Sequence, residues 1–212
     1  MIFSRRNILS KLGVLALAGM TMGSVSAQNL NVADLMTPGP LGDKILGSET
    51  APVTLVEYAS MTCSHCANFH ATVYPTLKSK YIDTGKVRFV FREFPLDAVA
   101  TGAFMLARCA PADKYFQMID VLFEQQKNWA FTKEPAKGLL AIAKQAGFTQ
   151  QSFETCLTDN KLADSIQEVA RRGNEKFGVN STPTFFVNGQ VVRGEMTLAA
   201  LDKLLEPLVK VQ

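Results

Sequence analysis

The spacing of hydrophobic positions changes along the chain, and these changes predict where strands and helices lie. Residues 53–58 form a short run of mostly β-branched, apolar and aromatic side chains, which is typical of a buried strand. Over residues 63–81 apolar side chains recur every four positions, as on one face of a helix, and Pro75 is expected to kink that helix. A second strand is predicted over 87–92. Strand, helix and strand in this order predict a βαβ unit with parallel strands and a right-handed crossover.

The pattern after the second strand is helical for about eighty residues. Strand signals then return on either side of Asn188 and Gly189, a pair that favours a tight hairpin because both residues tolerate positive φ. A final helix is predicted over 198–209. The sequence therefore predicts an α/β fold in which one small sheet is interrupted by an all-helical insertion. The helices expected in the insertion cover 98–109, 113–126, 136–145, 150–157 and 161–177, and the hairpin strands cover 184–187 and 190–193.

The first 27 residues have the layout of an export signal. Arg5, Arg6 and Lys11 precede an uncharged run that ends in small residues, so cleavage is expected after Ala27. A membrane anchor is the alternative, but glycine and hydroxyl residues dilute a run that is short for a bilayer span. The paired arginines also resemble a twin-arginine signal, which leaves the export route open. Residues 28–48, rich in Pro, Gly and Asn, are expected to be a lead-in segment without regular elements.

Composition and charge narrow the function classes. The chain has 212 residues, 47% of them hydrophobic and 19% charged, which is enough apolar material for a packed core and excludes wholesale disorder. It carries 22 Lys and Arg against 19 Asp and Glu, and three of those cations lie in the expected signal. The mature chain is therefore neutral, which argues against nucleic-acid binding and predicts a soluble protein beyond the membrane.

Four cysteines follow the expected cleavage point, in a setting that permits disulfides. They are Cys63, Cys66, Cys109 and Cys156, and three pairings are possible. A bond between Cys63 and Cys66 would restrain little chain, whereas one between Cys109 and Cys156 would close a long loop and stabilise the fold by up to about 4 kcal/mol. The spacing favours one reactive pair and one structural pair.

Cys63 and Cys66 form a C-x-x-C motif where a strand gives way to a helix. The helix N-terminus offers free amide hydrogens and the positive end of the helix dipole, and both stabilise a thiolate on Cys63. His65 can add positive charge beside that sulfur and lower its pKa further. Cys63 is therefore expected to be the exposed nucleophile and Cys66 the shielded resolving thiol.

Two other interpretations of this motif stay open. The pair could be a structural disulfide, although so small a ring restrains little of the unfolded chain and stabilises the fold weakly. Cys63, Cys66 and His70 could also hold a metal ion, but structural zinc requires a fourth ligand and His65 has little freedom to provide it. Outside a metal site, His70 is expected at the helix surface or partly buried, without a catalytic duty.

Two sequence stretches together resemble the DsbA family of thiol:disulfide interchange proteins. They are Glu57-Tyr58-Ala59-Ser60-Met61-Thr62-Cys63-Ser64-His65-Cys66 and Ser181-Thr182-Pro183-Thr184-Phe185-Phe186-Val187-Asn188-Gly189. The resemblance implies a thioredoxin-like fold with an inserted helical domain. On this basis the chain divides into a signal peptide (1–27), the first part of the thioredoxin-like domain (28–96), the helical insertion (97–178) and the remainder of the thioredoxin-like domain (179–212).

The resemblance also implies roles for four further residues. Pro183 corresponds to a cis-proline facing the active site, and Thr182 before it would pair its backbone with an extended substrate. Ser64, also placed in the substrate-binding set, stands where a proline is often found, and Thr182 stands where strong oxidases have valine. Glu57 would lie buried beneath the motif and take the proton of Cys66, unless it is a solvated carboxylate at a sheet edge.

The resemblance gives Cys109 and Cys156 the role of a second, non-catalytic disulfide, with unpaired buried thiols as the alternative. It implies an oxidase that introduces disulfide bonds into reduced, unfolded exported proteins in the periplasm, without a metal or organic cofactor. A membrane quinone-linked protein of the DsbB type would reoxidise it. Apolar residues near the motif would form a groove that binds unfolded chains with little selectivity. The alternatives are an isomerase or reductase, suggested by Thr182, and a non-catalytic exported binding protein whose disulfides are structural.

Overall fold

A computed structural model describes Leu30 and residues 32–210 of the chain. The expected signal peptide lies outside the described residues. Within the described ranges, none of the helices combines the length and apolar character that crossing a membrane requires.

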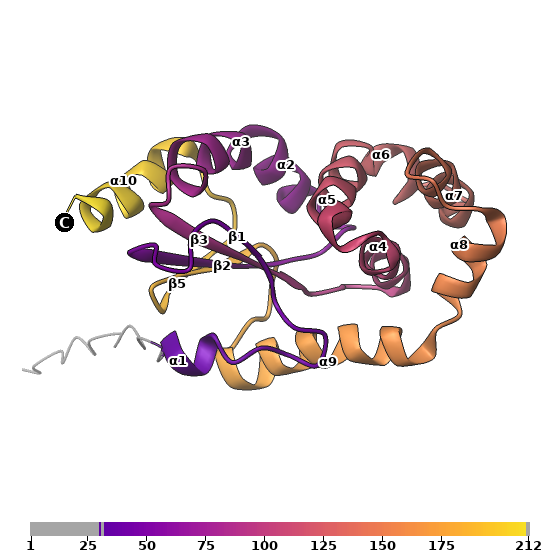
Figure 1. Ribbon diagram of the computed structural model, residues 1–212, viewed down its shortest axis with the longest axis horizontal. Helices are drawn as coiled ribbons and strands as arrows, with labels where there is room; N and C mark the ends of the chain where they lie inside the picture. Colours follow the sequence, from indigo (N-terminus) through magenta and orange to yellow (C-terminus); the bar gives the residue numbers. More distant parts are fainter. Residues whose placement is uncertain (1–29, 31, 211–212) are drawn as a thin grey trace, which may run out of the picture.

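A five-stranded mixed sheet forms the centre of the fold (Figure 1). The strand order is β1-β3-β2-β4-β5, with β2 and β3 parallel and the other neighbouring pairs antiparallel. The parallel pair confirms the predicted βαβ unit, and the Asn188-Gly189 turn joins β4 to β5 as expected. The strands are β1 (Lys44–Leu46), β2 (Val53–Ala59), β3 (Val87–Glu93), β4 (Thr184–Val187) and β5 (Gln190–Arg193).

Helices cover both faces of the sheet, and a group of helices lies beside it. In Figure 1, α2, α3 and α10 lie above the sheet, α1 and α9 lie below it, and α4 to α8 lie to one side. The helices are α1 (Val32–Leu35), α2 (Ser64–Thr72), α3 (Tyr74–Leu77), α4 (Ala98–Cys109), α5 (Tyr115–Glu124), α6 (Gln126–Trp129), α7 (Pro135–Gln145), α8 (Gln150–Leu157), α9 (Asn160–Phe177) and α10 (Leu198–Val209), with a π-helical turn η1 (Lys78–Ile82) and a 3₁₀ turn η2 (Ala112–Lys114).

Alternation along the strands divides the core between the two faces. Leu55 and Phe89 belong to the large hydrophobic cluster between the sheet and α2. Val56 and Val90 belong to the smaller hydrophobic cluster between the sheet and α9. Because side chains on a strand alternate, Glu57 shares the face of Leu55 and is directed toward α2. The sheet thereby places a carboxylate beneath the C-x-x-C helix.

The segment 63–81 was predicted to be one helix with a kink at Pro75, but the structure divides it into separate elements. Its three parts are α2, α3 and η1, and α2 ends at Thr72, just before Val73, whose φ and ψ are −115° and −45°. Pro75 lacks the N–H that a continuing helix would need and crowds the turn before it, so the helix breaks there rather than bending. The predicted helix over 113–126 is likewise divided, into η2, α5 and the start of α6.

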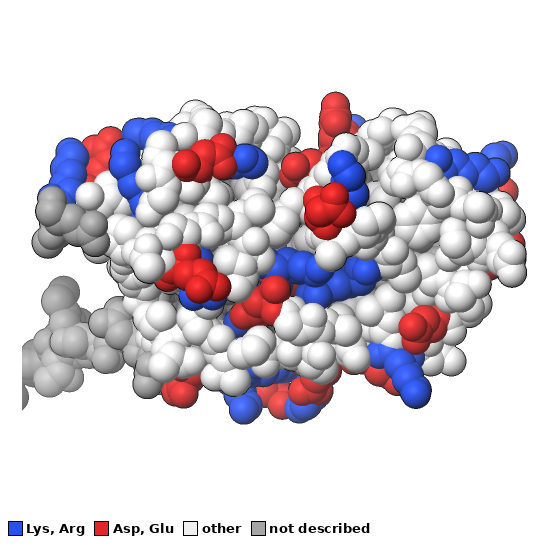
Figure 2. Space-filling view, viewed as in Figure 1, with Lys and Arg blue, Asp and Glu red and all other residues white. Residues whose placement is uncertain are grey.

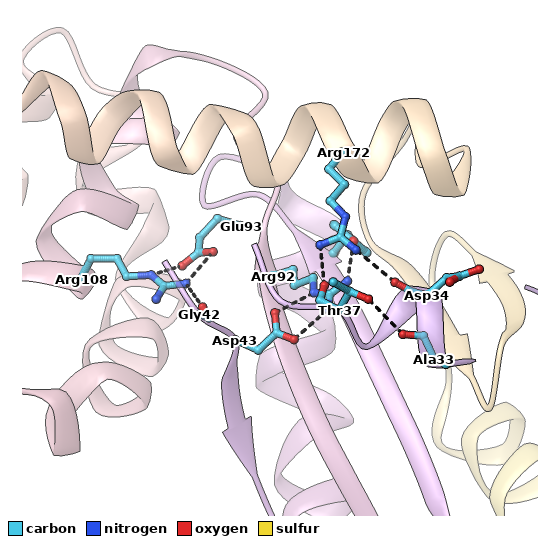
Figure 3. Close-up of polar contacts among 10 residues, drawn as sticks. Ala33, Asp34, Thr37, Gly42, Asp43, Arg92, Glu93, Arg108 and Arg172 are labelled. Atoms are coloured by element: carbon cyan, nitrogen blue, oxygen red, sulfur yellow. Dashed lines mark hydrogen bonds and ion pairs between the residues drawn. The ribbon is translucent and has the colours of Figure 1, made fainter. Parts of the chain in front are cut away.

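The lead-in segment contains regular structure that the sequence did not predict. Strand β1 pairs antiparallel with β3, and α1 precedes it. Three arginines hold this segment (Figure 3). Arg92 donates to both carboxylate oxygens of the Asp43 side chain, at 2.9 and 2.8 Å. Arg108 and Arg172 donate to backbone carbonyls of the segment. Arg108 also forms an ion pair with Glu93. Contacts with β3, α4 and α9 therefore order it, and none of them is visible in its local sequence.

Charges of both signs are interspersed over the face of the molecule shown in Figure 2. This distribution agrees with the balanced composition beyond the expected signal. The chemistry of the site therefore depends on local groups rather than on a broad field of one sign.

Candidate active site

The C-x-x-C motif lies at the junction between β2 and α2. Cys63 occupies the N-cap position, with extended φ and ψ of −85° and 118°, and its carbonyl accepts from the N–H of Ala67 at 3.1 Å. A side chain at the N-cap is directed toward the free amides of the first helical turn, where Ser or Asp ordinarily accepts a hydrogen bond. The chain therefore places a sulfur where an anion is favoured.

Several donors around Cys63 favour its thiolate. A hydrogen bond from the Cys66 side chain has the largest effect, and the backbone N–H groups of Cys66 and His65 act in the same direction. Together they outweigh the opposing effect of burial and lower the pKa of Cys63 to about 5. At neutral pH the first cysteine of the motif is therefore a thiolate.

The two thiols differ strongly in accessibility and acidity. Cys63 is 8% exposed and Cys66 is fully buried, and neither is bonded. The expectation of an exposed nucleophile is wrong, because Cys63 is buried at the junction of β2 and α2, against the loop before β4. Burial, together with the hydrogen bond to Cys63 and the charge of Glu57, raises the pKa of Cys66 well above its usual value.

Glu57 lies fully buried on β2, so the alternative of a solvated edge carboxylate is wrong. Its Oε2 lies 3.1 Å from Nε2 of His70. The expectation for His70 is also wrong, because this histidine is buried and its ring stacks on Phe123 with centroids 4.3 Å apart. Position 70 falls one helical turn after Cys66 on the inward face of α2, where the sheet covers it.

His65 and Ser64 occupy the exposed start of α2. The His65 side chain is 63% exposed, and its Nδ1 lies 3.9 Å from Oε2 of Glu195. The residue contributes to Cys63 through its backbone N–H. A direct charge effect of the imidazole on the Cys63 sulfur stays a prediction, as does a substrate contact for Ser64.

The loop before β4 lies against the motif. The Thr182–Pro183 peptide bond is cis, as the resemblance implies, and Sγ of Cys63 lies 3.3 Å from the Thr182 carbonyl oxygen, to which it donates when the thiol is protonated. The buried Oγ1 of Thr182 has no hydrogen-bond partner within the described part of the chain. It is therefore free to donate to a neighbouring anion, while the substrate-binding role of both residues stays a prediction.

Gln126 is a site residue that sequence reasoning missed. Its buried Nε2 donates to the carbonyls of Met61 and Cys63, at 2.8 and 3.0 Å. A glutamine at a junction between two helices has no local signal for such a role. Its contacts tie the α5–α6 junction to the backbone of the motif and so restrain the position of Cys63.

The second pair of cysteines lies in the helical group. Cys109 at the end of α4 and Cys156 in α8 form a disulfide that spans 47 positions of sequence. Among the described residues, no three His, Cys, Asp or Glu side chains, Cys63, Cys66 and His70 included, gather in a way that could hold an ion.

A groove of 860 Å³ runs beside the motif between α2 and α5. The expectation of a largely apolar groove is only partly met, since charged groups line it together with alanine and aromatic side chains. Its lining includes Ser64, Ala67, Ala71, Tyr74, Phe123, His70, Lys78, Asp120, Glu124, Gln126 and Lys127.

Comparisons with known proteins agree with this geometry. A thioredoxin family model matches residues 41–207. The crystal structure of α-DsbA1 from Wolbachia pipientis superposes with a TM-score of 0.77 at 33% identity, and the match covers 84% of this chain and 95% of that one. The similarity therefore includes the sheet, the motif and the helical group together.

Two curated sequences extend the comparison. A presumed protein-disulfide oxidoreductase of Rickettsia bellii is 34% identical over 168 residues, which is 77% of this chain and 65% of that protein. Disulfide bond formation protein D of Bacillus subtilis is 26% identical over 183 residues, which is 82% of this chain and 78% of that protein. The chain thus spans just under two thirds of the length of the Rickettsia relative.

Proposed function

The chain belongs to the DsbA family of thiol–disulfide oxidoreductases with a thioredoxin fold, and on that premise we propose that it is an oxidase, which introduces disulfide bonds into other proteins. One observation carries the oxidase assignment: the donors at the start of α2 stabilise the thiolate of Cys63, which exists only in the reduced enzyme. Whatever stabilises the reduced pair makes the disulfide a stronger oxidant.

The direction of this effect follows from the stability of the thiolate. Lowering the pKa of Cys63 from 9.0 to about 5 stabilises the reduced form at neutral pH relative to a pair whose first thiol keeps its ordinary pKa. For the two-electron couple this makes the Cys63–Cys66 disulfide more oxidising.

The proposed reaction is a two-step exchange. A substrate thiolate attacks Sγ of Cys63, the Cys63–Cys66 bond breaks, and Cys66 leaves and takes up a proton. A second substrate thiolate then attacks the substrate sulfur of the mixed disulfide, and Cys63 leaves as a thiolate. The substrate loses two electrons to the cysteine pair and gains a disulfide. The pair itself is the redox group in this scheme, which needs no metal or organic cofactor.

The compartment and partners belong to the same proposal. Residues 1–27 would direct export to the periplasm and be removed, in the way the sequence layout suggests. Substrates would be reduced, unfolded exported proteins, which pair backbone groups with Thr182 and Pro183 beside Cys63. A DsbB-like, quinone-linked membrane protein would restore the disulfide.

Two measurements test the oxidase assignment. The first is the redox potential of the cysteine pair against glutathione, with Cys63 thiolate titrated by its ultraviolet absorbance. The second compares the rate at which the oxidised protein forms disulfides in a reduced, unfolded substrate with the rate at which it rearranges scrambled ones. We expect an oxidising potential, a Cys63 pKa near 5 and fast oxidation.

Other outcomes would assign a different function. A potential close to that of thioredoxin with rapid rearrangement of scrambled disulfides would favour the isomerase or reductase alternative. A Cys63–Cys66 bond that resists mild reduction and oxidises no substrate would favour a non-catalytic binding protein with structural disulfides.

A further inference from the structure

We propose that His70 relays protons between the buried Glu57–Cys66 pair and Asp120 at the groove beside α2. Disulfide exchange at the motif requires Cys66 to gain a proton when it leaves and to lose one when it attacks. Both Cys66 and its carboxylate neighbour are fully buried, so these protons need a route to solvent. The proposal rests on the exchange reaction proposed above and deepens it.

The inner part of the route is defined by contacts on one face of α2. Cys66 and His70 lie four residues apart, both buried and both directed at the sheet face that carries Glu57. Nε2 of His70 lies 3.1 Å from Oε2 of Glu57, within hydrogen-bond distance. Oε1 of the same carboxyl group is buried and has no partner among the described atoms, so it is available to Cys66. The two oxygens can therefore serve the two neighbours separately.

The outer part of the route leads to the groove. Nδ1 of His70 is buried and has no hydrogen-bond partner within the described residues, although it lies 3.9 Å from Oδ1 of Asp120 on α5. That gap is longer than a hydrogen bond, and a small rotation of the half-exposed Asp120 side chain or one bridging water would close it. Asp120 lines the 860 Å³ groove, so its carboxylate meets solvent directly.

An unpaired buried imidazole nitrogen needs an explanation, because a buried polar atom that loses its hydrogen bond to water without gaining another destabilises the fold. A packing role would be served as well by an apolar ring, given that the ring already stacks on Phe123. A residue that accepts a proton at one nitrogen while releasing one from the other explains both the unpaired Nδ1 and the paired Nε2.

The relay balances in both directions. When Cys66 leaves as a thiolate, Glu57 takes the proton of Nε2 and, after rotation of its carboxyl group, gives it to Cys66, while Nδ1 takes a proton from Asp120, which regains one from water in the groove. Glu57 is thus ionised before and after the step, one proton enters from the groove and no electrons move along the route. When Cys66 later attacks, its proton passes to Glu57 and on to Nε2, and Nδ1 releases one to Asp120. The starting tautomer is then restored.

Several titratable groups face this route and would shape its pH dependence. Glu57 on β2 and Cys66 on α2 lie inside, Tyr74 on α3 packs against the imidazole ring, and Asp120 lies on α5. Lys78 and Glu124 act on Asp120 from the groove. Burial raises the pKa of Asp120 above its usual value, an effect that brings this carboxyl closer to neutral pH as a proton carrier.

The test measures the proton-dependent step directly. Reduced protein is mixed with oxidised glutathione, and quenched samples show by mass how fast Cys66 resolves the Cys63–glutathione disulfide between pH 5 and 9. His70→Gln keeps a donor for Glu57 but cannot pass a proton, so we expect resolution at pH 7 to slow by about tenfold or more, with a flattened pH profile and an unchanged Cys63 pKa. We expect Asp120→Asn to slow it by about threefold, a smaller effect because water in the groove can replace the carboxylate.

Chemical rescue separates a relay from a packing role. His70→Ala opens space on the groove side, so added 4-methylimidazole should restore at least part of the lost rate in a concentration-dependent way. Glu154→Gln on α8 is the matched control, since it removes an exposed carboxylate that neither lines the groove nor contacts His70 or Asp120, and its rate should stay within about twofold of wild type.

Two results would overturn the relay. One is a wild-type resolution rate and pH profile in His70→Gln; the other is a slow His70→Ala that no imidazole restores. Both are distinct from failure of the oxidase assignment, which would appear in the wild-type protein as an ordinary Cys63 pKa or as a reducing potential.

Discussion

The two pairs of cysteines in this chain show how environment decides what a thiol does. Cys63 and Cys66 are three positions apart and unbonded, and they lie where a strand meets a helix. Cys109 and Cys156 are 47 positions apart and bonded, and they join two helices of the insertion. Donors surround the first sulfur of the first pair, whereas the second pair connects segments that are distant in sequence.

The difference is one of free energy in the two oxidation states. At the motif, helix amides and the neighbouring Cys66 thiol favour a thiolate on Cys63, so the reduced form is stabilised relative to the disulfide. In the insertion, the bond restrains a long loop in the unfolded chain, so the oxidised form stabilises the fold. Cys63 and Cys66 are therefore suited to thiol–disulfide exchange, whereas Cys109 and Cys156 are suited to a stable structural disulfide.

The largest expected effect comes from removing the nucleophile. Cys63→Ser should abolish oxidation of a reduced, unfolded substrate, because serine cannot form the mixed disulfide. The measurement is substrate free-thiol content over time, with Cys109→Ala/Cys156→Ala as the matched control that removes the same residue type elsewhere. Oxidation that persists in Cys63→Ser, or vanishes in the control, would exchange the roles assigned to the two pairs.

The pH dependence of Cys63 comes next. The pKa of Cys63 in the folded protein is lowered from 9.0 to about 5, so the thiolate stabilises the reduced protein fully above about pH 9. This stabilisation decreases as the pH is lowered from 9 and is lost below about pH 5. The alkylation rate of Cys63 in the reduced protein should therefore have its midpoint near pH 5. The buried Cys66 serves as the internal comparison and should stay unlabelled at neutral pH; a Cys63 midpoint near 9 would contradict the thiolate assignment.

Loss of the insertion disulfide should affect stability rather than exchange. Cys109→Ala/Cys156→Ala opens a 47-residue loop, and we expect the free energy of unfolding to fall by up to about 4 kcal/mol. Denaturant unfolding measures this change, while the rate of substrate oxidation should stay within about twofold. Unchanged stability together with altered activity would mean that this bond tunes the active site instead.

The smallest expected effect belongs to His65. Its imidazole is exposed and lies near Glu195, so solvent and the carboxylate both weaken its field at the Cys63 sulfur. We expect His65→Ala to raise the Cys63 pKa by about one unit and to make the potential slightly more reducing. Thiolate absorbance and glutathione equilibration measure both quantities, and no change in either would restrict the residue to its backbone contribution.

Local sequence was a good guide wherever one residue type decides local geometry. Helix α8 and the hairpin strands have the predicted bounds, because caps and the Asn188-Gly189 turn set them. A kink at Pro75 was predicted, but a full break at Val73 and strand β1 were not. The break depends on how a proline affects the turn before it, and β1 exists only through pairing with β3 and the arginine contacts around it.

The candidate site divides in the same way. Cys63, Cys66 and Pro183 could be chosen from motifs, because their chemistry is tied to residue type and spacing. Gln126 and the burial of His70 could not. Gln126 reaches the motif from a helix more than sixty residues away, and His70 is buried because β2 and α5 cover it from both sides.

The sequence by itself determined the strand–helix order, the reactive pair at a helix start and the alternation that directs Glu57 toward α2, since each follows from nearest neighbours along the chain. Only the tertiary structure decided how acidic Cys63 is, how deeply Cys66 lies and which groups surround Glu57. Those properties depend on desolvation and on hydrogen bonds between segments distant in sequence, and folding alone brings these segments together.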